Sequence, residues 1–169
     1  MCSTNIPTLQ RTREVKMDIE VFGPEWGQPF CDKVARQLKG AICVMSTKLG
    51  IGHEPINYEI LLGRTINKLD GDCRGWASAQ KFGKIWSATI FVARGENFND
   101  MLSTLAHELI HVKQFIKDGL DVDDGMFKGR RWNARKNQDE DFDSPWEREA
   151  YGKEVALLEY YLDYVRRNS

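Results

Sequence analysis

The chain has 169 residues, of which 41% are hydrophobic and 29% are charged. This length and balance suit one globular domain with a real core and exclude a disordered chain. The formal net charge of −1 excludes the overall basic field that accompanies nonspecific nucleic-acid binding. The four cysteines form no C-x-x-C pair, which excludes zinc-ribbon and thioredoxin-like motifs and favours a reducing compartment.

The start of the chain is expected to be an arm followed by a single domain. Residues 1–16 are polar and lack the apolar stretch of a signal peptide, so we expect a flexible arm there and one domain over residues 17–169. No apolar run approaches the roughly 20 residues that a membrane helix requires. We therefore expect a cytoplasmic protein that makes no contact with a membrane.

The first half of the domain is expected to form a sheet and one helix. Period-two alternation predicts a strand over residues 17–22, and apolar residues three and four apart predict a helix over residues 29–49. Apolar and aromatic content predicts further strands over residues 57–62, 75–80 and 85–94. The last two are joined by a turn around residues 81–84, so we expect them to form a hairpin.

A helix in the second half carries the most informative motif. Asn99 or Asp100 can cap it, and it is predicted to run from about residue 101 to residue 117 or 118. His107 and His111 lie roughly opposite its apolar stripe, so one side of the helix packs on the sheet and the other faces something polar. The stripe consists of Leu102, Leu105, Leu109, Val112 and Ile116.

Residues 107–111 read His-Glu-Leu-Ile-His, the pattern H-E-x-x-H. On a helix the two histidines share one face a turn apart, where both imidazoles can reach one metal ion. Glu108 would lie beside a metal-bound water, where a general base belongs. We therefore expect Zn²⁺ on His107 and His111 with Glu108 as the catalytic residue; the alternative is a pair of solvated or core histidines.

Catalytic zinc usually has three protein ligands and keeps a fourth position for water. His53 is poorly placed because a proline follows soon after it, so we expect a carboxylate from a last helix that runs from Pro145 to about Arg166. Glu147 and Glu149 are both in its first turn but point in nearly opposite directions. We favour Glu147 over Glu149, since it shares a side with other residues expected to face inward. The predicted apolar side of this helix comprises Val155, Leu158, Leu162 and Val165.

Three segments together resemble a known family. They are the H-E-x-x-H motif, Lys-Gly-Arg-Arg-Trp at residues 128–132 and Pro-Trp-Glu-Arg-Glu-Ala at residues 145–150. Over about residues 75–165 the combination is similar to small gluzincin and SprT-like zinc metallopeptidases, including phage-encoded ones. The resemblance implies an α+β, zincin-like fold in which a small mixed sheet packs on the H-E-x-x-H helix. An N-terminal helix and a C-terminal helix complete it, the latter supplying Glu147 as the third ligand. A phage-encoded member would act in the cytoplasm of the host.

The resemblance also implies a peptidase that acts on a protein or peptide substrate. Glu108 would take a proton from a water activated by the zinc ion and return it to the leaving amine. Many gluzincins carry an aspartate one turn after the glutamate ligand, where this chain has Tyr151. An extended substrate would pair with an edge strand, over either residues 75–80 or residues 87–93. Candidate donors to the oxyanion are Tyr151, Trp132 and the Arg130–Arg131 pair.

The alternative function is a binding module in which zinc only stabilises the fold. Its contacts to nucleic acid or an acidic partner would come from Lys128, Arg130, Arg131, Arg135 and Lys136. The same long connection, residues 119–145, also contains Asp139, Glu140, Asp141 and Asp143, so its charge nearly cancels and nucleic-acid contact has weak support. Glu108 separates the two functions, because a structural zinc site has no need of a base.

Overall fold

The computed structural model describes residues 17–23, 28–63, 74–93, 97–132 and 144–168. These residues form a mixed α+β fold, with a four-stranded mixed sheet, a two-stranded hairpin and three long helices. The coarse fold class predicted from the sequence is therefore confirmed. The expected arm over residues 1–16 lies outside the described residues.

The sheet contains β1 (Asp18–Phe22), β2 (Ile56–Gly63), β3 (Gly75–Phe82) and β4 (Ile85–Ala93), in the order β1-β2-β4-β3. β1, β2 and β4 are parallel, while β3 runs antiparallel to β4 as its hairpin partner. β4 is thus an inner strand, and β3 forms one edge of the sheet. Of the two segments expected to provide an edge strand, the structure selects the one that starts at Gly75.

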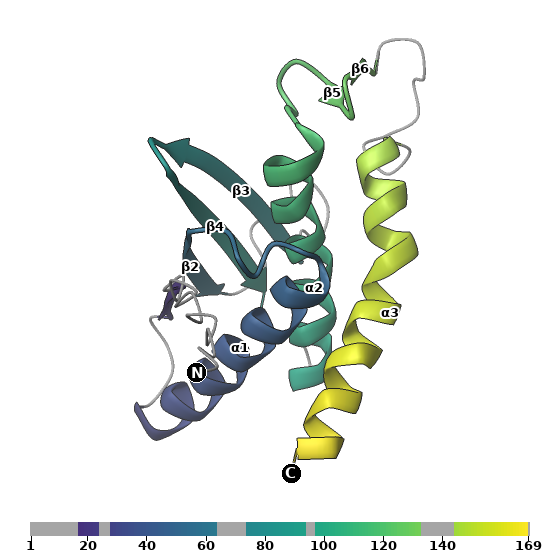
Figure 1. The fold of residues 1–169 in the computed structure, drawn as a ribbon. Helices are drawn as coiled ribbons and strands as arrows, with labels where there is room; N and C mark the ends of the chain where they lie inside the picture. Colours follow the sequence, from purple (N-terminus) through teal and green to yellow (C-terminus); the bar gives the residue numbers. More distant parts are fainter. Residues whose placement is uncertain (1–16, 24–27, 64–73, 94–96, 133–143, 169) are drawn as a thin grey trace, which may run out of the picture.

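The core lies between the inner face of the sheet and the helices α1 (Gln28–Lys48) and α2 (Phe98–Lys113). α2 lies between the sheet and α3 (Pro145–Asn168), as Figure 1 shows. The alternation of β2 turns every second side chain inward, and helical spacing brings apolar residues of α1 and α2 against them. Fully buried examples include Leu38, Ile42, Tyr58, Ile60, Leu105 and Leu109.

α2 begins earlier than the sequence predicts. Its cap is Asn97 rather than Asn99 or Asp100, and Asp100 completes a capping box by accepting from the Asn97 backbone amide. Asp100 therefore does serve the helix start, but from the third helical position. At its other end α2 passes into a π-helical turn, η1 (Gln114–Asp118), which stops at Gly119 in the left-handed conformation.

The buried side of α3 agrees with the prediction in part. Leu158 and Leu162 of the predicted stripe are partly buried against the core, whereas Val155 and Val165 are exposed. The fully buried residues are Ala150, Leu157 and Tyr161. Tyr161 can be buried because its hydroxyl donates to the carbonyl oxygen of Gln37 on α1, 3.4 Å away. The spacing of aliphatic residues alone predicts a buried face that is rotated by about one residue position from the observed face.

None of the described helices is long and apolar enough to cross a membrane.

The connection between η1 and α3 contains a small hairpin, β5 (Met126–Phe127) and β6 (Arg130–Arg131). Its two turn residues, Lys128 and Gly129, both have positive φ, at 50° and 71°. Such values define the turn type whose twist suits a tight two-residue hairpin. The hairpin presents the Lys128 side chain toward the start of α3, where it meets Glu149.

Candidate metal centre

Two helices bring the predicted ligands together. His107 and His111 lie one turn apart on α2, and Glu147 comes from the first turn of α3, where the Ser144 hydroxyl accepts from the Glu147 backbone amide. The two imidazole Nε2 atoms are 3.1 Å apart. The Glu147 carboxylate lies 3.2 Å from each of them, through Oε2 to His107 and Oε1 to His111. These residues form a group able to hold a metal ion.

The outer nitrogens of both imidazoles are occupied by acceptors. His107 Nδ1 lies 2.7 Å from Oε2 of Glu154, which as a carboxylate can only accept, so Nδ1 carries the proton. His111 Nδ1 lies 2.8 Å from Oε1 of Gln114, whose amide nitrogen donates to the carbonyl oxygen of Trp146. That second bond fixes the amide, so Oε1 accepts and His111 also carries its proton on Nδ1. In the neutral form of each imidazole, the lone pair is therefore on Nε2, which faces the Glu147 carboxylate.

Two imidazole nitrogens and a carboxylate that converge in this way can hold a cation between them. Around a tetrahedral zinc ion with bonds of about 2.0 Å, donor atoms lie about 3.3 Å apart. The 3.1 Å between the two Nε2 atoms, and the 3.2 Å from each of them to a different oxygen of Glu147, are close to this spacing. With one ligand atom taken from each residue, all three atoms lie within 4.8 Å of one another. The donor set of two imidazoles and a carboxylate is also the set that catalytic zinc uses. The residues present therefore fit Zn²⁺.

In the absence of a metal ion, a proton on an imidazole provides the positive charge that faces the Glu147 carboxylate. Burial disfavours the charged imidazolium of His107, but hydrogen bonds to Glu147 and Glu154 outweigh burial and raise its pKa to about 8. The pKa of His111 is also raised, because Glu147 outweighs burial there as well. Burial acts to raise the pKa of Glu147, but the two histidines lower it to about 2. Glu147 is thus a carboxylate throughout the neutral range.

Glu108, the residue after His107, carries a buried carboxyl group. Its side chain is 4% exposed, and burial raises its pKa to about 7, with the two histidines acting in the opposite direction. It lies against the first residue of β3, where a Cβ on Gly75 would be 2.6 Å from Glu108 Oε1. A glycine at the start of this edge strand therefore makes room for the glutamate. A proton acceptor with a pKa near neutrality suits general-base chemistry.

Glu149, the alternative third ligand, lies outside the group. Its carboxylate is bound by Lys128, Lys153 and Lys113, the last at 3.3 Å. Burial acts to raise the pKa of Glu149, but the three lysines lower it to about 2. Glu147 and Glu149 diverge around the helix as predicted, and Glu147 is the one that faces the histidines.

Sequence reasoning missed Glu154 and Gln114, which orient the two histidines. Glu154 follows Glu147 by seven residues, which places both on one face of a helix. That spacing was the available signal for Glu154. The Glu154 carboxylate is the partner of His107 that Tyr151, which has no carboxylate, cannot provide. Tyr151 instead packs its ring on His107, with centroids 4.6 Å apart.

Other residues expected near the site have contacts of their own. His53 is 72% exposed, with Glu54 as its carboxylate neighbour. Arg131 donates through Nε to the Asp124 carbonyl, and the Trp132 backbone amide donates to the Gly125 carbonyl.

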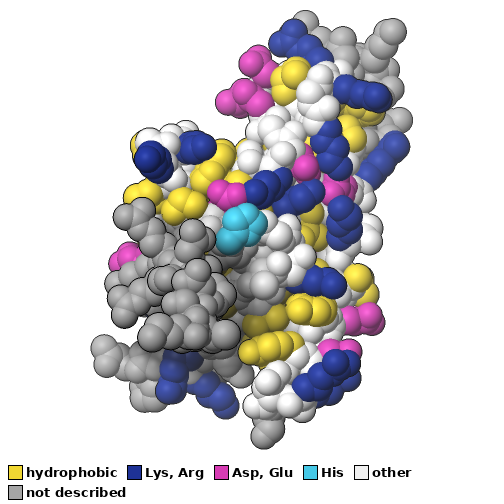
Figure 2. Space-filling model, in the orientation of Figure 1, with side chains coloured by type: hydrophobic (Ala, Val, Ile, Leu, Met, Phe, Trp, Pro, Cys, Tyr) yellow, Lys and Arg dark blue, Asp and Glu magenta, His cyan; other side chains and the backbone are white. Residues whose placement is uncertain are grey.

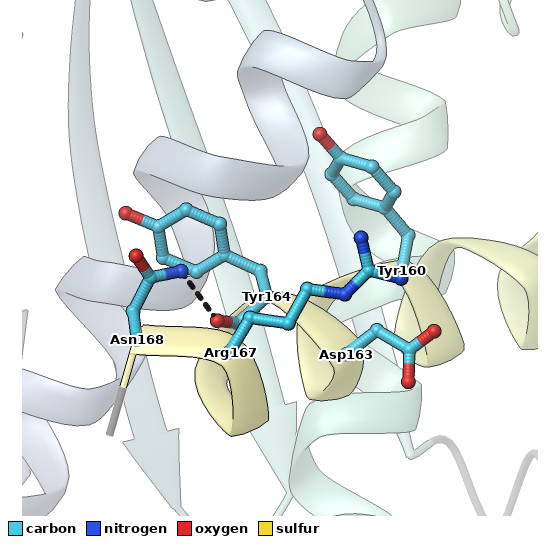
Figure 3. A pocket seen from close by; sticks show the side chains of 5 residues that line it. All are labelled: Tyr160, Asp163, Tyr164, Arg167 and Asn168. Carbon is cyan, nitrogen blue, oxygen red and sulfur yellow. Dashed lines mark hydrogen bonds between the residues drawn. The ribbon is translucent and has the colours of Figure 1, made fainter.

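A hollow of about 170 Å³ on the last turns of α3, drawn in Figure 3, is lined by Tyr160, Asp163, Tyr164, Arg167 and Asn168. It contains none of the metal-centre residues.

Compared with known proteins, the chain matches no family model and detectably resembles no curated protein and no solved structure.

The Glu154 contact yields a testable expectation. Substituting Glu154→Ala frees the His107 ring to rotate and removes the carboxylate that makes it a better donor, so zinc affinity should fall about 10- to 100-fold. Competition with a chromophoric chelator measures the change. Glu159→Ala is the matched control, because Glu159 is an exposed glutamate on the same helix. Equal affinities for the two variants would show that Glu154 does not support the site.

Proposed function

We propose that this chain is a zinc-dependent metallopeptidase that hydrolyses peptide bonds, with His107, His111 and Glu147 as ligands. The observation that carries the proposal is that the two Nε2 atoms, 3.1 Å apart, meet the Glu147 carboxylate, which has one oxygen 3.2 Å from each of them. The outer Nδ1 atoms of both imidazoles are already bonded to Glu154 and Gln114. The buried Glu108 beside this group supports catalysis over a purely structural role, because a stabilising zinc site gains nothing from a costly buried carboxyl group.

The arrangement of elements supports the zincin-like fold that the motifs imply. The H-E-x-x-H helix packs beside an antiparallel edge strand, and a later helix brings a glutamate to the two histidines. Edge strands offer alternating amide and carbonyl groups to an extended chain. We therefore propose that β3 pairs with the substrate backbone and that Gly75, next to Glu108, marks where the scissile bond lies.

When bound, Zn²⁺ supplies a water with a pKa near 7 and polarises the scissile carbonyl. Glu108 accepts a proton from the attacking water and then delivers it to the departing amine. His107 and His111 are held in the required tautomer by Glu154 and Gln114. Burial of the Glu108 carboxyl keeps its proton affinity high enough for both steps.

We assign oxyanion stabilisation to the Tyr151 hydroxyl. The ring lies on His107, and its pKa is raised by burial and by the charges of Glu147, Glu154 and Glu108, so the phenol stays protonated beside the metal centre. Tyr151→Phe keeps the ring packing and removes one donor, so kcat should fall roughly 10²- to 10³-fold with little change in KM. Tyr160→Phe on the same helix is the control. Steady-state kinetics in which both variants match the wild type would refute the assignment.

Zinc affinity should depend on pH. With its pKa raised to about 8, His107 is protonated in the metal-free protein at neutral pH, and zinc must displace that proton. The apparent affinity should therefore fall about tenfold for each pH unit below 8 and level off above it, per proton displaced. Chelator competition at several pH values measures this slope. A flat profile between pH 6 and 8 would contradict the protonation state inferred for the site.

The peptidase proposal is tested by incubating the zinc-loaded chain with an unfolded protein and following cleavage by mass spectrometry. We expect cleavage that a chelator abolishes and that added Zn²⁺ restores. His111→Ala, purified and loaded in the same way, controls for contaminating proteases. Cleavage by wild type and His111→Ala at equal rates would count against the proposal.

The binding-module alternative gains no support from the described basic residues. Lys128 is paired with Glu149, and Arg131 with Asp124. In Figure 2, basic and acidic side chains lie side by side around β5 and β6. Neutralised charges of this kind are a poor footprint for nucleic acid. Arg135 and Lys136 lie outside the described residues.

A further inference from the structure

The tip of the β3–β4 hairpin carries an exposed apolar pair. Phe82 and Ile85 are register partners across the turn, and they are 64% and 47% exposed. Lys81 and Lys84 are exposed beside them. The hairpin projects away from the helices in Figure 1, and Figure 2 shows hydrophobic and basic side chains together at its tip. Large apolar side chains that lie together on an exposed, projecting turn mark a candidate site for binding another polypeptide.

The same hairpin connects this tip to the metal centre. β3 begins at Gly75, against Glu108, and ends at Phe82. At about 3.3 Å per residue, the seven steps between them span about 23 Å. Within the part of the chain that the structure describes, no strand pairs with the outer edge of β3. A chain that pairs with β3 from the metal centre outward therefore reaches the tip after about seven residues.

The two faces of β3 determine which side chains a paired polypeptide meets at the hairpin tip. Trp76, Ser78, Gln80 and Phe82 alternate outward on the face opposite the helices. Residues directly opposite each other on paired strands point to the same face. A substrate residue opposite Phe82 would thus lie against the phenyl ring, with Ile85 on the far side of it. Lys84, in the turn, can bind a carboxylate next to that residue.

We propose that the hairpin tip, defined by Phe82, Lys84 and Ile85, is a remote subsite for the substrate of this peptidase. It binds an apolar side chain about seven residues from the scissile bond, with an acidic residue beside it. The substrate class is then a long, extended polypeptide rather than a short peptide. This inference rests on the proposed function, and adds to it a selectivity that the metal centre itself does not supply.

The test uses peptides built around one bond that the wild type cleaves in an unfolded protein. One peptide keeps three residues on each side of the bond, and longer ones extend either side to eight residues. The extended peptides carry Leu-Glu or Ser-Ser around the seventh position. Each is assayed with the zinc-loaded wild type, Phe82→Ser and Lys84→Glu. Phe22→Ser is the matched control, because Phe22 is an exposed phenylalanine on β1, at the opposite edge of the sheet.

We expect the Leu-Glu extension on one side to raise kcat/KM about tenfold, as burial of one apolar side chain and a cross-strand pair predict. The Ser-Ser extension should give little of this gain. Phe82→Ser should remove the gain and leave the short peptide unaffected, Lys84→Glu should reduce it, and Phe22→Ser should preserve it.

Two results would overturn the subsite. One is an equal gain in wild type and Phe82→Ser, or none on either side, while the short peptide is still cleaved. The other is a change of oligomeric state in Phe82→Ser with an unchanged length dependence, which would identify the tip as a self-association surface. If the wild type cleaves no bond in an unfolded protein, the proposed function itself fails, and the subsite with it.

Discussion

Glu108→Gln should reduce peptide hydrolysis by roughly 10²- to 10⁴-fold while zinc stays bound, because the amide keeps the size of the side chain but cannot accept a proton. The buried carboxyl group lies against the start of β3, and burial raises its pKa to about 7. Activity on a mapped peptide and zinc content are measured on the same preparation.

The size of this effect separates catalysis from structural zinc binding. Replacing a buried carboxyl by a neutral amide of the same size removes the cost of burying a charge, so the fold should be retained. A thermal melt checks this point. Unchanged hydrolysis in a folded, zinc-loaded Glu108→Gln protein would remove the general base from the mechanism, and with it the argument against the binding-module alternative.

Glu147→Ala should weaken zinc binding by more than about 100-fold. Loss of a residue that merely orients a ligand costs about 10- to 100-fold, and loss of the ligand itself must cost more. The substitution also leaves two facing imidazole lone pairs without their carboxylate. Zinc content after dialysis and affinity by chelator competition provide the readout.

Glu149→Ala is the matched control for Glu147→Ala, since the two residues lie in the same turn of α3. It should leave zinc binding unchanged and cost up to about 1 kcal/mol of stability, the range of a partly exposed ion pair. Because the pKa of Glu149 is lowered to about 2, its contribution is present above the unfolded pKa of about 4.5 and is lost as the pH falls through 4.5 toward 2. Loss of zinc from Glu149→Ala but not from Glu147→Ala would reverse the ligand assignment.

The parts of the site that follow from local geometry could be predicted from the sequence. The positions of His107, Glu108 and His111 depend only on helical periodicity, and Glu147 faces them because its direction around α3 differs from that of Glu149. The four strands of the main sheet were predicted to within two residues, since alternation and turn residues are local signals, whereas β5 and β6 were not predicted.

The remaining features depend on how elements pack. Glu154 reaches His107 only because α2 and α3 run side by side, and Gln114 reaches Trp146 only where η1 meets the start of α3. The buried face of α3 was predicted only in part because Tyr161 takes an inward position that its hydrogen bond to α1 makes tolerable. A single sequence carries little information on such contacts between elements.

The most direct test of the metal centre is X-ray absorption at the zinc edge, on protein loaded with one equivalent of Zn²⁺. The account predicts two imidazole nitrogens and oxygen ligands at about 2.0 Å, and loss of the imidazole signal in a His107→Ala, His111→Ala double variant. Sulfur ligands, or an all-oxygen shell identical in wild type and double variant, would contradict it.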